Sequence, residues 1–145
     1  MTATSLTDRE DILNQLGAAA RLLDQKEWHE LDQVFHPKVT FDYGDGLGTR
    51  SGLDALRGHF RRFLDGCGPT QHLLGSIIWT RAETGATTHA YVQARHDGLG
   101  DLSGEVFDTN GEYVDQWART DGGWRIISRH VTWHVLAGNP AVLGF

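Results

Sequence analysis

The chain has 145 residues, 39% of them hydrophobic and 10% aromatic, a composition typical of one globular domain over residues 1–145 and not of a disordered chain. Its formal net charge of −6, with 13 lysines and arginines spread along the sequence and no basic run, argues against binding to nucleic acid or to an anionic membrane surface. No apolar run approaches the ~20 residues that a membrane helix needs, and the first residues do not resemble a signal peptide, so we expect a soluble, cytoplasmic protein.

The first half of the chain has helical patterns. Residues 7–10, Thr-Asp-Arg-Glu, form a capping-box pattern that predicts a helix starting at Thr7. On that helix Asp24 ends an apolar stripe, where its carboxylate is costly to bury without a hydrogen-bond donor. A second short helix is predicted over residues 26–37, which end at a proline, and a third over residues 52–64.

The second half of the chain is predicted to form a sheet. Beyond a short strand at residues 38–43, strands are expected at residues 70–82, 86–97, roughly 103–108, 111–120 and 123–137. Short turns that contain glycine, at residues 83–85, 110–111 and 121–123, separate these runs, which favours an antiparallel meander. Helices followed by a long curved sheet predict an α+β fold in which the sheet wraps the helices and leaves a pocket between the two layers.

A histidine, His72, stands inside an otherwise apolar strand. Alternation places Leu74, Ser76 and Ile78 on the same side of the strand as His72, and Leu73, Gly75, Ile77 and Trp79 on the other side. One interpretation is a core histidine bonded to a carbonyl group. The other is a pair with Asp24, in which the carboxylate fixes the ring tautomer and the imidazole acts as a general base.

Several runs resemble a known family. The runs LLDQKEWHEL, FDY, TQHLLG and DGGWRI, with their spacing, are similar to those of the scytalone dehydratase-like, SnoaL-like branch of the nuclear-transport-factor-2-like (NTF2-like) superfamily. The resemblance covers most of residues 8–135. It implies a cone of three N-terminal helices packed in a strongly curved, mostly antiparallel mixed sheet that encloses one pocket, and a homo-oligomer, either a trimer or a dimer.

The resemblance also carries site residues. Asp24 and His72 match the Asp–His dyad of the family, and Tyr43 matches a tyrosine that helps to hold a water against the substrate carbonyl. His96 falls near a second pocket histidine of the family. The tyrosine that precedes the aspartate in scytalone dehydratases is Leu23 here, so substrate recognition is expected to differ.

Further substrate contacts are expected around this dyad. The residues assigned to substrate binding are His96, Tyr113, Trp28, Leu74 and Ala94. Alternation puts His96 on the same face as Ala94 and two other small apolar residues. Such a wall suits a flat, apolar, aromatic or polyketide-like substrate.

The resemblance therefore implies a cofactor-independent lyase or isomerase, of the dehydratase or cyclase type, that removes and returns a proton. A second interpretation is an epoxide hydrolase or cyclase of the limonene-epoxide-hydrolase type on the same fold, for which Asp42, Asp115 and Arg129 are candidate residues. A third is a ligand-binding module without catalysis, because one fold can carry several functions.

No metal or cofactor is expected. His130 and His134 lie four residues apart on one strand, about 13 Å, too far to share a metal ion, and Cys67 is the single cysteine. Three other histidines, His29, His36 and His59, are expected on helix surfaces or at a turn and receive no role. Aromatic side chains expected on the outer face of the sheet, consistent with burial in an oligomer, are Trp79, Tyr91 and Trp117.

Overall fold

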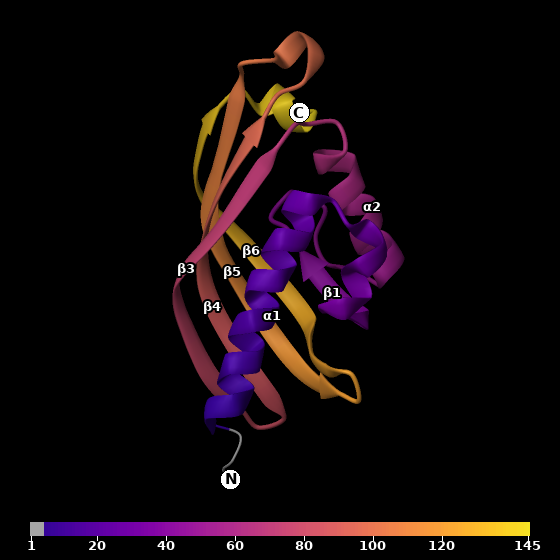
Figure 1. Cartoon of the computed structure of the whole chain (residues 1–145), viewed down its shortest axis with the longest axis vertical. Helices are drawn as coiled ribbons and strands as arrows, with labels where there is room; N and C mark the ends of the chain where they lie inside the picture. Colours follow the sequence, from indigo (N-terminus) through magenta and orange to yellow (C-terminus); the bar gives the residue numbers. More distant parts are fainter. Residues whose placement is uncertain (1–4) are drawn as a thin grey trace.

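A computed structural model describes residues 5–145 and confirms the α+β cone (Figure 1). The strands are β1 (Phe35–Asp42), β2 (Arg50–Ser51), β3 (Thr70–Ala82), β4 (Gly85–Asp97), β5 (Val106–Thr120) and β6 (Gly123–Gly138). They form a six-stranded sheet in the order β2-β1-β6-β5-β4-β3, in which only β1 and β6 pair in parallel. Residues 1–4 belong to the predicted domain but lie outside the described residues.

The helices cover one face of this sheet. They are α1 (Ser5–Gln25), η1 (Trp28–Gln33) and α2 (Leu53–Leu64), with short 3-10 turns η2 (Gly100–Leu102) and η3 (Pro140–Leu143) later in the chain. Figure 1 shows α1 lying along the long strands and α2 on the side of β1, with the C-terminus near α2. Because α1 packs on β3 and α2 packs on β1, the core lies between the helices and the concave face of the sheet.

The helix boundaries differ from the predicted ones. Helix α1 begins at Ser5, so Thr7 lies within the helix and the predicted capping box does not start it. The second helix is a 3-10 helix that ends at Gln33, and Phe35 already begins β1. Pro37, expected to stop a helix, lies instead in β1, where the pairing with β6 shifts register and a residue without an N–H is tolerated.

The predicted break at residues 110 and 111 is wrong, because β5 is continuous from Val106 to Thr120. The glycine is needed there for a different reason. The register with β6 shifts between Asn110 and Gly111, and a Cβ on Gly111 would lie 2.1 Å from the Thr132 carbonyl oxygen. Gly111 therefore marks a bulge where two backbones approach closely, not a turn.

A second bulge corrects the predicted faces of β3. Ser76 has a positive φ of 47°, and the pairing with β4 shifts register between Gly75 and Ile78. Beyond this bulge, Ile77 and Trp79 pack against the core while Ile78 is exposed, the reverse of the simple alternation.

The expected outer aromatic face is also wrong for two of its three residues. Trp117 is 2% exposed, and its indole N–H donates to Thr88 in the core. Trp79 is partly buried against the core. Only Tyr91, 55% exposed, lies outward as expected, and assembly into a dimer or trimer stays a prediction.

Candidate functional site

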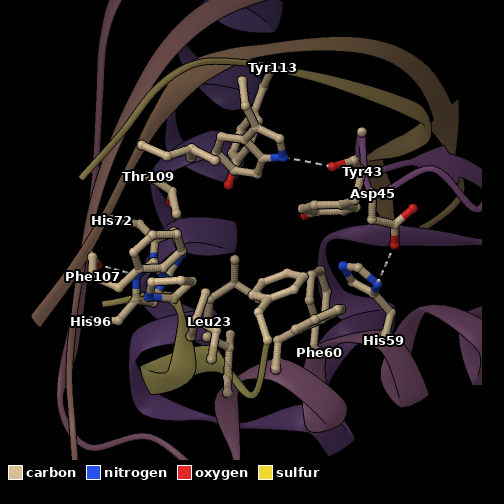
Figure 2. Close-up of a pocket in the computed structure, with 18 residues that line it drawn as sticks. Leu23, Tyr43, Asp45, His59, Phe60, His72, His96, Phe107, Thr109 and Tyr113 are labelled. Atoms are coloured by element: carbon tan, nitrogen blue, oxygen red, sulfur yellow. Dashed lines mark hydrogen bonds and ion pairs between the residues drawn. The ribbon is translucent and has the colours of Figure 1, made fainter. Parts of the chain in front are cut away.

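A cavity of about 470 Å³ opens between the helices and the concave face of the sheet (Figure 2). Its walls are mostly apolar, with Leu23 from α1, Phe60, Phe63 and Leu64 from α2, Phe107 from β5, and Leu136 and Trp133 from β6. The polar side chains that reach it are Tyr43, Asp45, His59, His72, His96, Thr109 and Tyr113. A largely apolar cavity with a limited set of polar side chains is the usual composition of a small-molecule site.

His72 and Asp24 are hydrogen-bonded at one side of this cavity. Helix α1 brings Asp24 to the start of β3, where its Oδ1 lies 2.7 Å from His72 Nδ1. The same carboxylate accepts from the backbone N–H of His72 at 3.1 Å and from the Thr70 hydroxyl at 2.8 Å. The Asp24 carboxylate is therefore held by three donors, and it fixes the His72 ring.

The charge state of Asp24 follows from these bonds. Burial raises the pKa of Asp24. Its hydrogen bonds with His72, the charge of His72 and the hydrogen bond from Thr70 together lower the pKa by more, so it lies below its usual value. Asp24 is thus a carboxylate at neutral pH and accepts from the Nδ1–H of His72. In a neutral ring this leaves the lone pair on Nε2, the nitrogen that can take a proton from a ligand in the cavity.

His96 lies beside His72 on the neighbouring strand. The two rings meet edge to face, with centroids 5.6 Å apart, and both line the cavity. His96 Nδ1 lies 2.8 Å from the carbonyl oxygen of Phe107, so it carries the hydrogen and donates it. Burial lowers the pKa of His96 despite this hydrogen bond, so His96 is neutral at physiological pH.

Tyr43 lies just beyond the end of β1, and its hydroxyl oxygen accepts from Arg129 Nη1 at 3.3 Å. Arg129 in turn makes two hydrogen bonds to Asp115, at 2.7 and 2.8 Å, and stands 4.0 Å over the ring of Tyr113. Burial raises the pKa of Tyr43, only partly offset by Arg129, so its phenol keeps the proton. Because its oxygen accepts from Arg129, the Tyr43 O–H remains a donor.

The turn after Tyr43 is fixed by its neighbours. The Tyr43 carbonyl accepts from the indole N–H of Trp133 at 2.8 Å. Gly44 follows with a φ of 67°, and a Cβ there would lie 2.8 Å from the carbonyl oxygen of Val131. A glycine is therefore required at this position, and it lets the chain turn so that Tyr43 and Asp45 both line the cavity.

Three residues expected to contact substrate lie outside the cavity. Trp28 is buried in the core, where its N–H donates to Asp65 at 2.7 Å and its ring stacks on Phe60. Leu74 packs against the core further along β3. Ala94 is buried opposite His72 in the sheet and does not line the cavity. The cavity is lined by Tyr113 and His96 as expected, and not by these three.

Of the three residues suggested for epoxide opening, the structure brings Asp115 and Arg129 together but leaves Asp42 apart from them. Asp115 and Arg129 form a bidentate pair with side chains 0% and 1% exposed, and neither lines the cavity. Asp42 lies on the other face of the sheet, where it accepts from the backbone N–H of Gly44 and stands 4.0 Å from His130. Asp42 therefore does not join Asp115 around a common water site.

His59 is a polar cavity residue that the sequence interpretation missed. It was expected on a helix surface, but it is 7% exposed and lines the cavity from α2. Its spacing was informative, because His59 stands three residues after Leu56 and four before Phe63, which places it on the apolar side of the helix. Asp45 was missed because a turn residue has no periodicity.

Two kinds of feature are absent from the part of the chain that the structure describes. Within residues 5–145, no group of three or more histidine, cysteine, aspartate or glutamate side chains is arranged to hold a metal ion. Over the same range, no helix combines the length and apolar character required to cross a membrane.

The fold and the cavity together define a protein of the NTF2-like cone class, and comparisons give the family. Residues 4–130 match the SnoaL-like domain, so the chain belongs to the SnoaL-like family. A comparison with curated protein sequences gives no match.

Solved structures share the fold over almost the whole chain. The Kfla4162 protein from Kribbella flavida is 24% identical, with a TM-score of 0.87 over 94% of this chain and 97% of that one. A protein of Novosphingobium aromaticivorans provisionally named scytalone dehydratase is 21% identical, with a TM-score of 0.85 over 96% and 92%. Another from the same species, provisionally named aromatic ring hydroxylase, is 25% identical, with a TM-score of 0.81 over 95% and 97%.

Proposed function

We propose that this protein is a cofactor-independent lyase or isomerase in which His72 removes a proton next to a carbonyl group of a small apolar or aromatic substrate. The observation that carries the proposal is the 2.7 Å contact between His72 Nδ1 and Asp24 Oδ1 beside an apolar cavity. Membership of a family with dehydratase-named structural relatives supports the reaction class.

The chemistry follows from the three polar groups. His72 Nε2 takes the proton from the carbon, and the C–H electron pair moves into a new C=C bond as the carbonyl becomes an enolate. Asp24 stabilises the imidazolium that forms, because its carboxylate already accepts from Nδ1. The Tyr43 O–H donates to the enolate oxygen, directly or through a water.

The imidazolium then returns its proton. If the substrate carries a hydroxyl on the next carbon, the proton goes to that oxygen, water leaves, and a conjugated C=C bond remains. If it carries no leaving group, the proton returns to another carbon and the product is an isomer. Both outcomes balance in atoms and electrons without an oxidant, which fits a site built from a dyad and a phenol alone.

The proposal is tested by proton exchange, which requires no knowledge of the natural substrate. Acetophenone, an aromatic ketone with exchangeable protons next to its carbonyl, is incubated with the protein in D₂O, and deuterium incorporation is followed by NMR. The wild-type chain is expected to accelerate exchange, and His72→Ala to lose about 10²–10⁴-fold. Asp24→Asn is expected to lose a comparable factor, since the amide no longer fixes the tautomer.

His134→Ala is the matched control, because His134 is an exposed histidine of β6 that does not line the cavity. It is expected to exchange protons like the wild type. Binding of the ketone without any exchange above the buffer rate would contradict the proposal and favour a ligand-binding module. Equal exchange in the wild type and in His72→Ala would show that His72 is not the base.

A further inference from the structure

A second polar group faces the cavity across from the dyad and takes no part in the proposed proton transfer. It consists of His59 on α2 and Asp45 in the turn after β1, which both line the cavity, and of Arg50 on β2, which does not line it but is hydrogen-bonded to both. Figure 2 shows His59 and Asp45 at the side of the cavity opposite His72 and His96. The side chains of His59 and Asp45 are 6% and 9% exposed, so this group belongs to the interior and not to the surface.

Arg50 fixes the tautomer of His59. Its Nη2 lies 3.1 Å from His59 Nδ1 and 2.9 Å from Asp45 Oδ2. A guanidinium group can only donate hydrogen bonds, so Nδ1 must be the acceptor, and a neutral His59 ring carries its hydrogen on Nε2. Asp45 and the ring of Phe41, 4.9 Å from the guanidinium carbon, keep Arg50 in place.

The remaining ring nitrogen of His59 points toward the cavity. In Figure 2 it is turned inward beside Tyr43, whose ring centroid lies 4.5 Å from that of His59. Among residues 5–145, no side chain or backbone group accepts a hydrogen bond from His59 Nε2. An N–H donor inside a mostly apolar cavity without a protein partner is costly unless a ligand or water accepts from it.

We propose that His59 is a specificity-determining residue whose Nε2–H donates a hydrogen bond to a neutral oxygen of the substrate, on the side of the ring system opposite the carbon that faces His72. The expected ligand is a flat ring ketone with a second accepting oxygen, such as an ether, hydroxyl or carbonyl, across the ring. A carboxylate is disfavoured there because Asp45 lines the same end of the cavity and already neutralises Arg50.

Electrostatics support this assignment. Burial, the charge of Arg50 and, to a smaller extent, that of Arg62 lower the pKa of His59 to about 4, although Asp45 acts in the opposite direction. His59 is therefore neutral at physiological pH and remains a fixed single donor. Only the orientation of the ligand, with its reacting end toward His72, rests on the proposed function.

Two ketones of nearly equal size test the inference. 4-Methoxyacetophenone has an accepting oxygen across the ring from its carbonyl, and 4-ethylacetophenone has a methylene at that position. The Kd of each is measured by titration calorimetry, and the ratio of the two values is compared between proteins, so that differences in ligand hydrophobicity cancel. Wild-type protein is expected to favour the methoxy compound by about 3–10-fold relative to His59→Met, the effect of one neutral hydrogen bond.

His59→Gln is the matched variant, since glutamine is close to methionine in length but keeps an N–H donor near the position of Nε2. It is expected to retain most of the preference for the methoxy compound. His59→Phe, which keeps a ring without a donor, should behave like His59→Met, and it serves if the methionine variant does not fold. A ratio that is the same in the wild type, His59→Met and His59→Phe would overturn the inference, as would a glutamine variant that loses the preference as fully as methionine.

These measurements are independent of turnover. If acetophenone exchange fails while the methoxy preference depends on His59, the base assignment is wrong and the His59 subsite stands. If exchange depends on His72 while the preference for the methoxy compound does not depend on His59, the base assignment stands and the His59 subsite is wrong.

Discussion

His72 and His96 lie edge to face with ring centroids 5.6 Å apart, yet only His72 is paired with a carboxylate. His96 donates to a backbone carbonyl, and burial lowers its pKa. A proton taken by His72 gives an imidazolium next to Asp24, whereas a proton taken by His96 gives a buried cation with no carboxylate bonded to it. We therefore expect the two histidines to have different roles in the same cavity.

Replacement of each histidine by asparagine separates these roles. Asparagine offers an N–H close to the Nδ1 position, so the bond to Asp24 or to Phe107 can persist, but it lacks the basic Nε2. We expect His72→Asn to reduce ketone proton exchange by about 10²–10⁴-fold and His96→Asn by less than about tenfold. The NMR exchange rate measures both, and equal losses would contradict the assignment of His72 as the base.

Tyr43 is expected to act on the enolate oxygen and not on ketone binding alone. Tyr43→Phe removes the donor while keeping the ring that packs on His59 and Phe60. We expect the exchange rate at saturating ketone to fall by about 10²-fold, with a smaller change in ketone Kd. Tyr113→Phe, which removes the neighbouring phenol, serves as the control and should lose far less. A loss seen only in Kd would assign Tyr43 to ground-state binding.

The ion pair beneath Tyr43 makes a prediction about stability. Asp115 and Arg129 are both almost fully buried, so Arg129→Met leaves an unpaired carboxylate in the core. We expect the free energy of unfolding, measured with urea, to fall by about 3–5 kcal/mol. In the double variant Arg129→Met with Asp115→Leu, no buried charge remains, and most of this loss should be recovered. A double variant no more stable than Arg129→Met would contradict this account.

The element order was predictable because it depends on local patterns. Apolar periodicity and glycine turns predicted the helices and the long hairpins, and the apolar stripe that ends in Asp24 predicted a buried partner, which the structure supplies in His72 at 2.7 Å. The details of strand pairing were harder to predict from the sequence. The bulges at Ser76 and Gly111 depend on the facing strand. Alternation alone therefore assigned the wrong face to Trp79, and the Asn-Gly pair at residues 110 and 111 was interpreted as a turn.

The composition of the cavity was harder to predict than the dyad. Trp28, Leu74 and Ala94 have inward positions, but an inward side chain reaches either the packed core or the cavity, and periodicity does not separate the two. His59 was missed for a related reason. His59 stands on the apolar side of its helix. Its partners are Asp45 in a turn and Arg50 in a two-residue strand, and neither segment has a periodic pattern that sequence analysis could detect.

His59 also makes a prediction about stability in acid. Its pKa is lowered to about 4 in the folded chain from an ordinary value of 6.5, chiefly by burial and by Arg50. Between these two pH values the unfolded chain binds a proton that the folded chain does not, so stability falls as the pH drops through this window. Above it the ring is neutral in both states and makes no contribution.

Between about pH 7.5 and about pH 4, we expect the free energy of unfolding of the wild type to fall by about 3 kcal/mol more than that of His59→Gln. The variant has no titrating group at this position. Asp24 and His96 are present in both proteins, so their own acid dependence cancels in the comparison. Urea denaturation at the two pH values measures the difference. Equal acid sensitivity in both proteins would mean that His59 titrates normally, and that Arg50 does not hold its Nδ1 as an acceptor.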